Sequence, residues 1–175
     1  MKKVILLVIL ATLSVSCNSL LELLELKVDN DLSEDINVSV PKTTGATGNF
    51  DLTKAVDLRS GDFAEYVDKI TAVKINSFNF KFKEFVGNSA GTIPSGTIKF
   101  DNTTVGTITN LNVSKEAIAG TVFEITDTAI LSQLENTFVN NSSTVITLTG
   151  NAHSEAGPMD FKVEVNISLT ATIKE

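Results

Sequence analysis

The C-terminal stretch 159–174 alternates strictly between apolar and polar side chains along its whole length. Its apolar members are Met159, Phe161, Val163, Val165, Ile167, Leu169, Ala171 and Ile173, with polar residues such as Asn166 between them. A period of two places every apolar side chain on one face of an extended chain. The pattern therefore predicts one long strand that is buried on one face and exposed to solvent on the other. Because it exceeds the usual strand length, we expect it to bend or to serve two sheets.

A second alternating stretch covers residues 73–82 and changes parity in its middle. Val73 and Ile75 follow one parity, whereas the phenylalanines at 78, 80 and 82 follow the other. An extra residue that re-aims a strand in this way is a β-bulge, so we expect a bulge at Asn76 and Ser77. Shorter runs predict further strands at 36–40, 96–100, 105–113, 120–125 and 143–150.

Two segments depart from the β pattern and have helical spacing. In the stretch 61–70, apolar side chains recur at helical intervals after a plausible N-terminal cap pair, Asp62 with Glu65. In the stretch 127–141, the stripe is Ile130, Leu131, Leu134 and Phe138, with Asp127 or Thr128 as the cap. Many antiparallel strands with two short helices predict a mainly β chain, an antiparallel β-sandwich of about seven to nine strands.

The N-terminal residues 1–16 have the order of a secretory signal peptide. Lys2 and Lys3 precede an apolar run that is too short to span a membrane as a mature helix, and small residues follow at 14–16. We therefore expect residues 1–16 to be removed, leaving residues 17–175 as a single domain.

Cys17, the one cysteine of the chain, directly follows the small residues at 14–16. The arrangement resembles the lipobox of bacterial lipoproteins, in which the new N-terminal cysteine is diacylated. It departs from the usual lipobox, because Ser14 stands where Leu, Val or Ile is common and Leu13 lies one position further back. The resemblance, which covers the first seventeen residues, implies lipidation of Cys17 and membrane attachment through that lipid. Acylation would also remove a lone thiol from an oxidising compartment.

After cleavage the chain carries 14 minus 2, or 12, basic residues against 21 acidic ones, a net charge of −9. Such a charge repels the phosphate backbone, so we expect no nucleic-acid partner. Beyond Cys17 we find no apolar run long enough for a membrane helix, which leaves the lipid as the evident anchor. Only Asn18 and Ser19 separate the anchor from the leucine-rich run 20–28, which fits a helix or a strand and which we expect to pack against the domain.

Residues able to support catalysis or to hold a metal are few. His153, the one histidine, stands in a turn-like sequence without a nucleophile-elbow motif, so we interpret it as a surface loop residue. The acidic run 29–35 places Asp29, Asp31 and Ser33 at calcium-like spacing. However, Glu34 and Val40 occupy the positions of the required glycine and glutamate, so we interpret the run as a solvated turn. We expect no cofactor and no metal.

Two short motifs resemble glycosylation signals. The stretch 127–129 resembles a sequence that some Gram-negative bacteria O-glycosylate, but it fits a helix cap better. Asn37 and Asn112 begin Asn-x-Ser/Thr sequons, which have little meaning if the resemblance to a lipobox makes this a bacterial protein.

Two functional hypotheses remain. In the first, the protein is a non-enzymatic lipoprotein of the cell envelope that binds a protein partner or supports an envelope assembly. In the second, the sandwich carries an apolar small molecule among its phenylalanines, although these are more often core residues. In many enterobacterial lipoproteins, an aspartate directly after the cysteine retains the protein in the inner membrane. Here Asn18 stands at that position, which favours the outer membrane.

Overall fold

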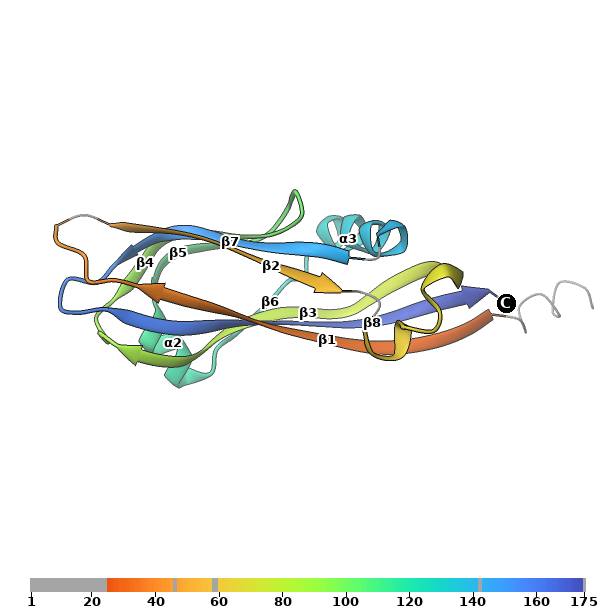
Figure 1. The fold of residues 1–175 in the computed structure, drawn as a ribbon, viewed down its shortest axis with the longest axis horizontal. Coiled ribbons are helices and arrows are strands. Elements are labelled where there is room, and N and C mark those ends of the chain that lie inside the picture. The colour runs from red at the N-terminus through yellow and green to blue at the C-terminus, as the bar shows by residue number, and fades with distance from the viewer. Residues whose placement is uncertain (1–24, 46, 58–59, 142, 175) are drawn as a thin grey trace, which may run out of the picture.

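A computed structural model describes residues 25–45, 47–57, 60–141 and 143–174 and shows two stacked antiparallel sheets (Figure 1). The first sheet, here called the long sheet, has the order β1-β8-β3-β6, and the second, the short sheet, has the order β2-β7-β4-β5. The prediction of an antiparallel β-sandwich is thus confirmed. The strands are β1 (Glu25–Val40), β2 (Gly48–Asp57), β3 (Ile70–Gly87), β4 (Thr92–Phe100), β5 (Thr103–Asn112), β6 (Val122–Glu124), β7 (Ser143–His153) and β8 (Met159–Lys174).

β8 is the strand predicted from the C-terminal alternation, and it lies inside the long sheet between β1 and β3. Every apolar member of the alternation, from Met159 to Ile173, is buried. β8 pairs with β1 from Met159 to Lys174 without a register shift. It therefore remains in one sheet, and the alternative that it serves two sheets is wrong.

The bulge predicted in β3 is confirmed by a register shift between Ile75 and Ser77. The backbone N–H of Ile75, beside this irregularity, donates a hydrogen bond to Glu135 Oε1 at 2.9 Å. The bulge therefore re-aims the phenylalanines of β3 and also provides the point at which a helix is attached to the strand.

β1 and β2 differ most from the prediction. β1 begins at Glu25 rather than at residue 36, so the acidic run 29–35 is part of a strand and not a turn. β2 was not predicted. Both are edge strands, and each carries a charged side chain toward the other: Lys54 Nζ lies 3.3 Å from Glu34 Oε2. Inward charges on edge strands protect a sheet from unwanted pairing, but they interrupt the apolar alternation.

Of the helices, α3 (Thr128–Asn140) is confirmed, and its cap is Asp127, whose carboxylate accepts hydrogen bonds from the N–H groups of Ala129 and Ile130. The helix predicted at 61–70 is wrong. That segment forms two 3₁₀ turns, η1 (Gly61–Phe63) and η2 (Val67–Lys69), because Tyr66 between them lies outside helical geometry and the segment is too short to offset helix nucleation.

A second α-helix lies where none was predicted, at α2 (Val113–Ala119). The Asn112 side chain caps its start by accepting from Lys115 N, and Gly120 ends it in the left-handed conformation.

The core between the sheets consists of aliphatic side chains and a group of phenylalanines that contact one another. Phe80 stacks on Phe123 with ring centroids 5.0 Å apart, and Phe78 meets Phe100 edge to face at 5.1 Å. The interpretation of the phenylalanines as core residues is confirmed for Phe78, Phe80 and Phe100, which are buried, and Phe123 packs against them partly buried.

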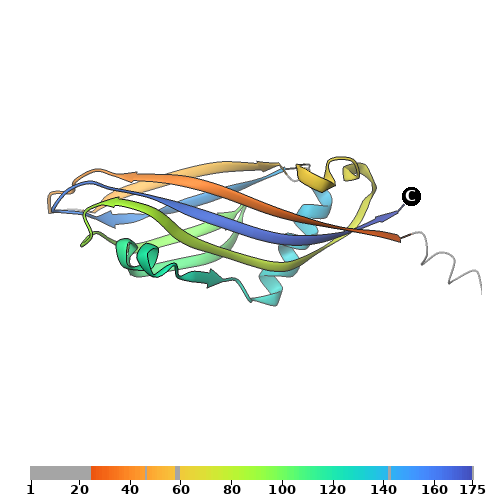
Figure 2. The same cartoon turned by 90° about the horizontal axis from the view of Figure 1, so that it is seen from below.

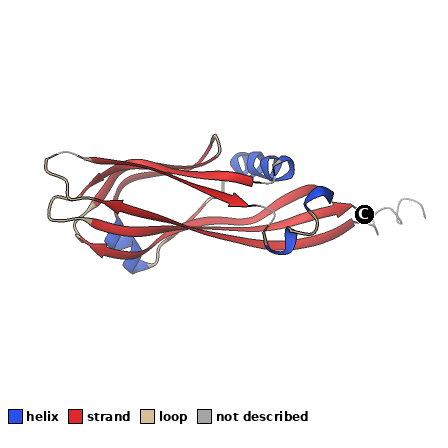
Figure 3. Ribbon diagram, viewed as in Figure 1, coloured by secondary structure: helices blue, strands red, loops and turns tan. Residues whose placement is uncertain are grey.

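The long sheet extends past the short sheet at one end, as Figures 1 and 2 show. There α3 and the two 3₁₀ turns, and not further strands, cover its inner face, as the colouring by secondary structure in Figure 3 makes plain. β1 enters the sheet at this same end. Within the described ranges, no helix is long and apolar enough to cross a membrane.

Candidate functional site

The outer side of the short sheet carries an ordered array of hydroxyl and amide side chains, here called the threonine face. Across its strands the register aligns Thr53, Thr147, Lys99 and Thr104 in one row. The complete set adds Asp51, Thr149, Thr97 and Thr107 in the next row, and Asn49, Asn151, Ser95 and Thr109 in the third. The residues that alternate with them, such as Leu148, Ile98 and Ile108, are buried.

The side chains of the threonine face are held by one another. Thr97 Oγ1 and Thr149 Oγ1 are 2.8 Å apart, and Asn151 Nδ2 donates to Ser95 Oγ at 3.1 Å. These bonds fix the side chains of the inner two strands, β7 and β4. Among the residues of the threonine face, Lys99 and Asp51 are the charged ones.

The outer side of the long sheet differs, because an ion-pair network crosses it among hydroxyl and amide residues such as Thr170 and Thr172. Glu164 on β8 contacts both Lys81, at 2.8 Å, and Lys83 on β3, and Lys83 also lies 2.8 Å from Asp35 on β1. Lys162 extends this network to Glu84, at 2.6 Å. The two outer faces of one sandwich therefore differ sharply in charge.

The charge network shifts the pKa values of two of its members, Glu164 and Lys83. Hydrogen bonds from Lys81, and then from Lys83 and Asn166, lower the pKa of the Glu164 carboxyl to about 2. Hydrogen bonds to Asp35 and Glu164 raise the pKa of the Lys83 ammonium above its ordinary value. Both shifts favour the charged forms and stabilise the pairing of three neighbouring strands.

Asn166 lies on the outward face, as its position in the alternation predicts, but it is not merely solvated. It accepts a hydrogen bond from Ser33 Oγ at 2.8 Å and donates to Glu164 Oε1 at 3.0 Å. Asn166 therefore ties β1 to the charged centre of the long sheet.

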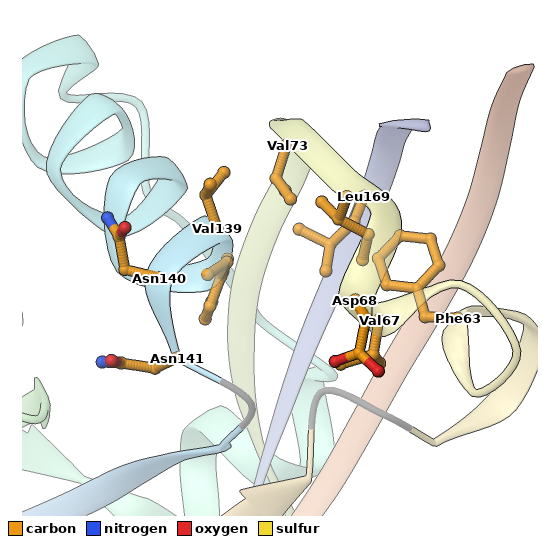
Figure 4. A pocket seen from close by; sticks show the side chains of 10 residues that line it. Phe63, Val67, Asp68, Val73, Val139, Asn140, Asn141 and Leu169 are labelled. Carbon is orange, nitrogen blue, oxygen red and sulfur yellow. The ribbon is translucent and has the colours of Figure 1, made fainter. Parts of the chain in front are cut away.

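A pocket of about 290 Å³, here called the end pocket, lies where the long sheet projects beyond the short sheet (Figure 4). Its walls come from η1, η2, β3, α3 and β8, and the apolar lining is Phe63, Val67, Ile70, Val73, Phe138, Val139 and Leu169. Asp68, Asn140 and Asn141 are exposed and complete the lining.

Specific hydrogen bonds position both sides of the end pocket. Glu135 attaches α3 to β3 through the Ile75 N–H. On the other side, the buried amide of Asn30 donates to Ser60 O at 3.1 Å and so fixes the approach to η1. Gly61 at this point has a φ of +67°, and a Cβ there would lie 2.6 Å from Asn30 Oδ1. The turn therefore requires glycine.

The residues singled out from the sequence do not converge on one site. Cys17 lies outside the described residues, as does the leucine-rich run up to residue 24. His153 is the last residue of β7 rather than a loop residue, and its Nε2 lies 3.7 Å from Glu155 Oε1. Asp29, Asp31 and Ser33 occupy alternate positions of β1, so they line up along a strand instead of surrounding an ion.

Among the described residues, no group of three or more His, Cys, Asp or Glu side chains is close enough to hold a metal ion. Neither the threonine face nor the end pocket was predicted. The alternating threonines were visible in the sequence, but the strand order that aligns them was not.

Comparisons with known proteins leave the family of this chain open. No protein-family model and no curated protein matches the sequence. Among solved structures, the decameric BFDV capsid protein is 8% identical, with a TM-score of 0.43, over 83% of this chain and 99% of the other. The Desmodium yellow mottle tymovirus structure is also 8% identical, with a TM-score of 0.35, over 83% and 84%.

The D431N VP2 protein of infectious bursal disease virus is 15% identical, with a TM-score of 0.35, over 82% of this chain and 31% of the other. The chain thus spans about a third of that VP2 structure. At these scores the resemblances carry no argument about function.

Proposed function

We propose that this protein is a non-enzymatic binding module of the bacterial cell envelope, anchored by a lipid on Cys17, that contacts a protein partner through the threonine face. The observation that supports the binding role is the contrast between the two outer faces of the sandwich. One carries a network of ion pairs across three strands, and the other is a hydroxyl and amide array in which Lys99 and Asp51 are the charged residues.

Interface cores are depleted of charged residues, because a charge that loses its water must regain an equivalent partner. Threonine and asparagine side chains lose less on desolvation and offer both donors and acceptors to a partner. From strand and residue spacings, three rows over four strands span roughly 20 Å by 20 Å, which suits an interface at the smaller, transient end of the range.

The non-enzymatic part of the proposal is supported by where the acid–base groups lie. Catalysis requires a nucleophile or base with a second group that orients it. Glu164, whose pKa is strongly lowered, belongs to a solvent-facing ion-pair network that joins strands. His153 is the last residue of β7, and its imidazole lies near the carboxylate of Glu155.

The anchor is tested by intact mass of the protein extracted from membranes. We expect an N-terminal Cys17 that carries acyl groups, and membrane fractionation should place the protein in the outer membrane, as Asn18 favours. A water-soluble mature protein with a free Cys17 thiol would contradict the proposed lipidation. It would leave the proposed binding through the threonine face untested by this experiment and open to the next one.

The binding role is tested by co-purification from membranes that are cross-linked before solubilisation. Thr149→Glu places a negative charge at the centre of the threonine face, and Asn37→Glu places the same side chain on the outer face of the long sheet, where it is matched by Lys162. We expect Thr149→Glu to reduce recovery of a stoichiometric partner at least tenfold and Asn37→Glu to leave it unchanged. Equal recovery with both variants would exclude the threonine face as the contact.

A second function, carriage of an apolar small molecule, is favoured by the end pocket. Its volume of about 290 Å³ lies at the lower limit of pockets that enclose small ligands, and seven of its ten lining residues have apolar side chains. The phenylalanines Phe63 and Phe138 contribute to that lining, whereas those between the sheets do not.

A further inference from the structure

We propose that the end pocket binds a straight acyl chain attached to an uncharged head group. This inference names the ligand class of the carrier function above and rests on it. Buried side chains, among them Phe63, Phe138 and Leu169, form the inner walls. These side chains offer an occupant apolar contact, which suits a hydrocarbon chain, and the polar side chains of the lining are exposed.

The volume sets the length of chain that fits. An apolar cavity of roughly 150 Å³ is known to enclose benzene, with its six carbon atoms. Scaled to about 290 Å³, the end pocket holds roughly ten to twelve carbon atoms. A chain of that length would fill the pocket, and further methylenes would remain outside.

The charge near the pocket disfavours an anionic head group. Asp68 is exposed and lines the pocket together with the neutral amides of Asn140 and Asn141 (Figure 4). An anionic head group would meet this carboxylate and the overall excess of acidic residues, which is 21 acidic against 14 basic in the whole chain. A neutral ester or amide head avoids that repulsion.

Two sources could supply such a chain: a lipid of the envelope, or the acyl groups proposed on Cys17. Leu169 in the pocket wall pairs with Asn30, five residues into β1, which places the pocket about 17 Å along the strand from Glu25. Cys17 precedes Glu25 by eight residues, which span at most about 26–29 Å when extended. The chain's own lipid is therefore within reach of the pocket.

The ligand class is tested by calorimetric titration of the mature chain carrying Cys17→Ala with monoacylglycerols of six to fourteen carbons, each below its micellar concentration. Affinity should rise about fourfold per methylene, which corresponds to about 0.8 kcal/mol, and should level off near ten to twelve carbons. Decanoate should bind at least fivefold more weakly than monodecanoylglycerol, and Asp68→Asn should narrow that difference.

Val139→Phe fills the pocket from its partly exposed wall, and Asn136→Phe adds the same side chain to an exposed position of α3. We expect the first to weaken monodecanoylglycerol binding at least tenfold and the second to leave it unchanged, with both variants folded by circular dichroism. An absence of saturable binding, or equal binding by both variants, would overturn the proposal.

The source is resolved in cells grown on a palmitic acid with a mid-chain diazirine. After irradiation of membranes, peptide mapping should find the photo-adduct on residues 60–75, on residues 135–141 or at Leu169 of β8. A link to the Cys17 acyl group identifies the chain's own lipid, and a link to a separate lipid identifies an envelope lipid. Adducts confined to other peptides would contradict the proposal. Intact mass reports lipidation of Cys17 separately, so failure of the anchor is distinguishable from failure of the pocket.

Discussion

The substitution Val165→Asp tests the alternation of β8 at its centre. Val165 is 2% exposed and pairs with Glu34 on one side and Phe80 on the other. Loss of the buried valine costs about 2 kcal/mol, and a neutral carboxyl without a partner costs about 2 kcal/mol more. The carboxyl must also be kept protonated above its ordinary pKa, which adds about 1.4 kcal/mol for each pH unit.

We therefore expect a loss of about 5 kcal/mol at pH 5 and up to about 3 kcal/mol more at pH 7. The sign follows from burial, which raises the pKa of the introduced carboxyl, so the penalty grows with rising pH. Urea unfolding followed by circular dichroism at both pH values measures it. A protein folded at pH 5 and largely unfolded at pH 7 is a predicted outcome, because total stabilities are about 5–15 kcal/mol.

Two matched variants complete this experiment. Val165→Asn removes the same apolar contacts without a titratable group and should cost about 4 kcal/mol at both pH values. Thr172→Asp introduces the same carboxylate on the outward face of β8, opposite Lys27, and should change stability by less than about 1 kcal/mol. Equal losses for Val165→Asp and Thr172→Asp, or a pH-independent loss for Val165→Asp, would refute the assignment of the two faces.

Three further substitutions probe single contacts. Thr144→Val should stabilise the fold by about 1 kcal/mol in urea unfolding, because Thr144 Oγ1 is buried without a hydrogen-bond partner among the described residues. Glu164→Gln should cost about 1 kcal/mol at pH 7. The lowered pKa of Glu164 means that its stabilisation is complete above about pH 4.5 and disappears toward pH 2, so wild type and Glu164→Gln should converge there in acid titrations. Gly61→Ala should cost about 1–2 kcal/mol and lower the Tm, because of the positive φ at Gly61 and the nearby Asn30 Oδ1.

The parts of the fold that could be predicted are those in which one local pattern is uninterrupted. β8 is flanked by strands on both sides, so its apolar period is complete, and the parity change in β3 located the bulge between Ile75 and Ser77. α3 was predicted because four apolar positions and the cap at Asp127 agree.

Edge strands could not be predicted in the same way. Glu34 in β1 and Lys54 in β2 point toward each other across the open side of the sandwich, where water still reaches them. Their charges break the alternation, so an edge strand looks like a polar loop in sequence. Asn166 shows a related limit: its outward position was predicted, but its bonds to Ser33 and Glu164 depend on strand order.

The two candidate sites depend on contacts between distant segments. The row formed by Thr53, Thr147 and Lys99 requires that β7 lie between β2 and β4, which no local pattern specifies. The end pocket joins η2 with α3, about seventy residues later in the chain. A sequence pattern predicts an element and its faces, whereas a site of this kind arises only when the elements are placed.

The most direct test of the binding role is photocross-linking in intact cells from single sites on the two outer faces. A benzophenone amino acid is placed at Thr107 or Thr53 on the threonine face, and at Asp31 on the outer face of the long sheet, all exposed positions. The proposed function predicts one discrete adduct with an envelope protein from both threonine-face positions and none from Asp31. No discrete adduct from Thr107 or Thr53, or the same adduct from all three positions, would contradict it.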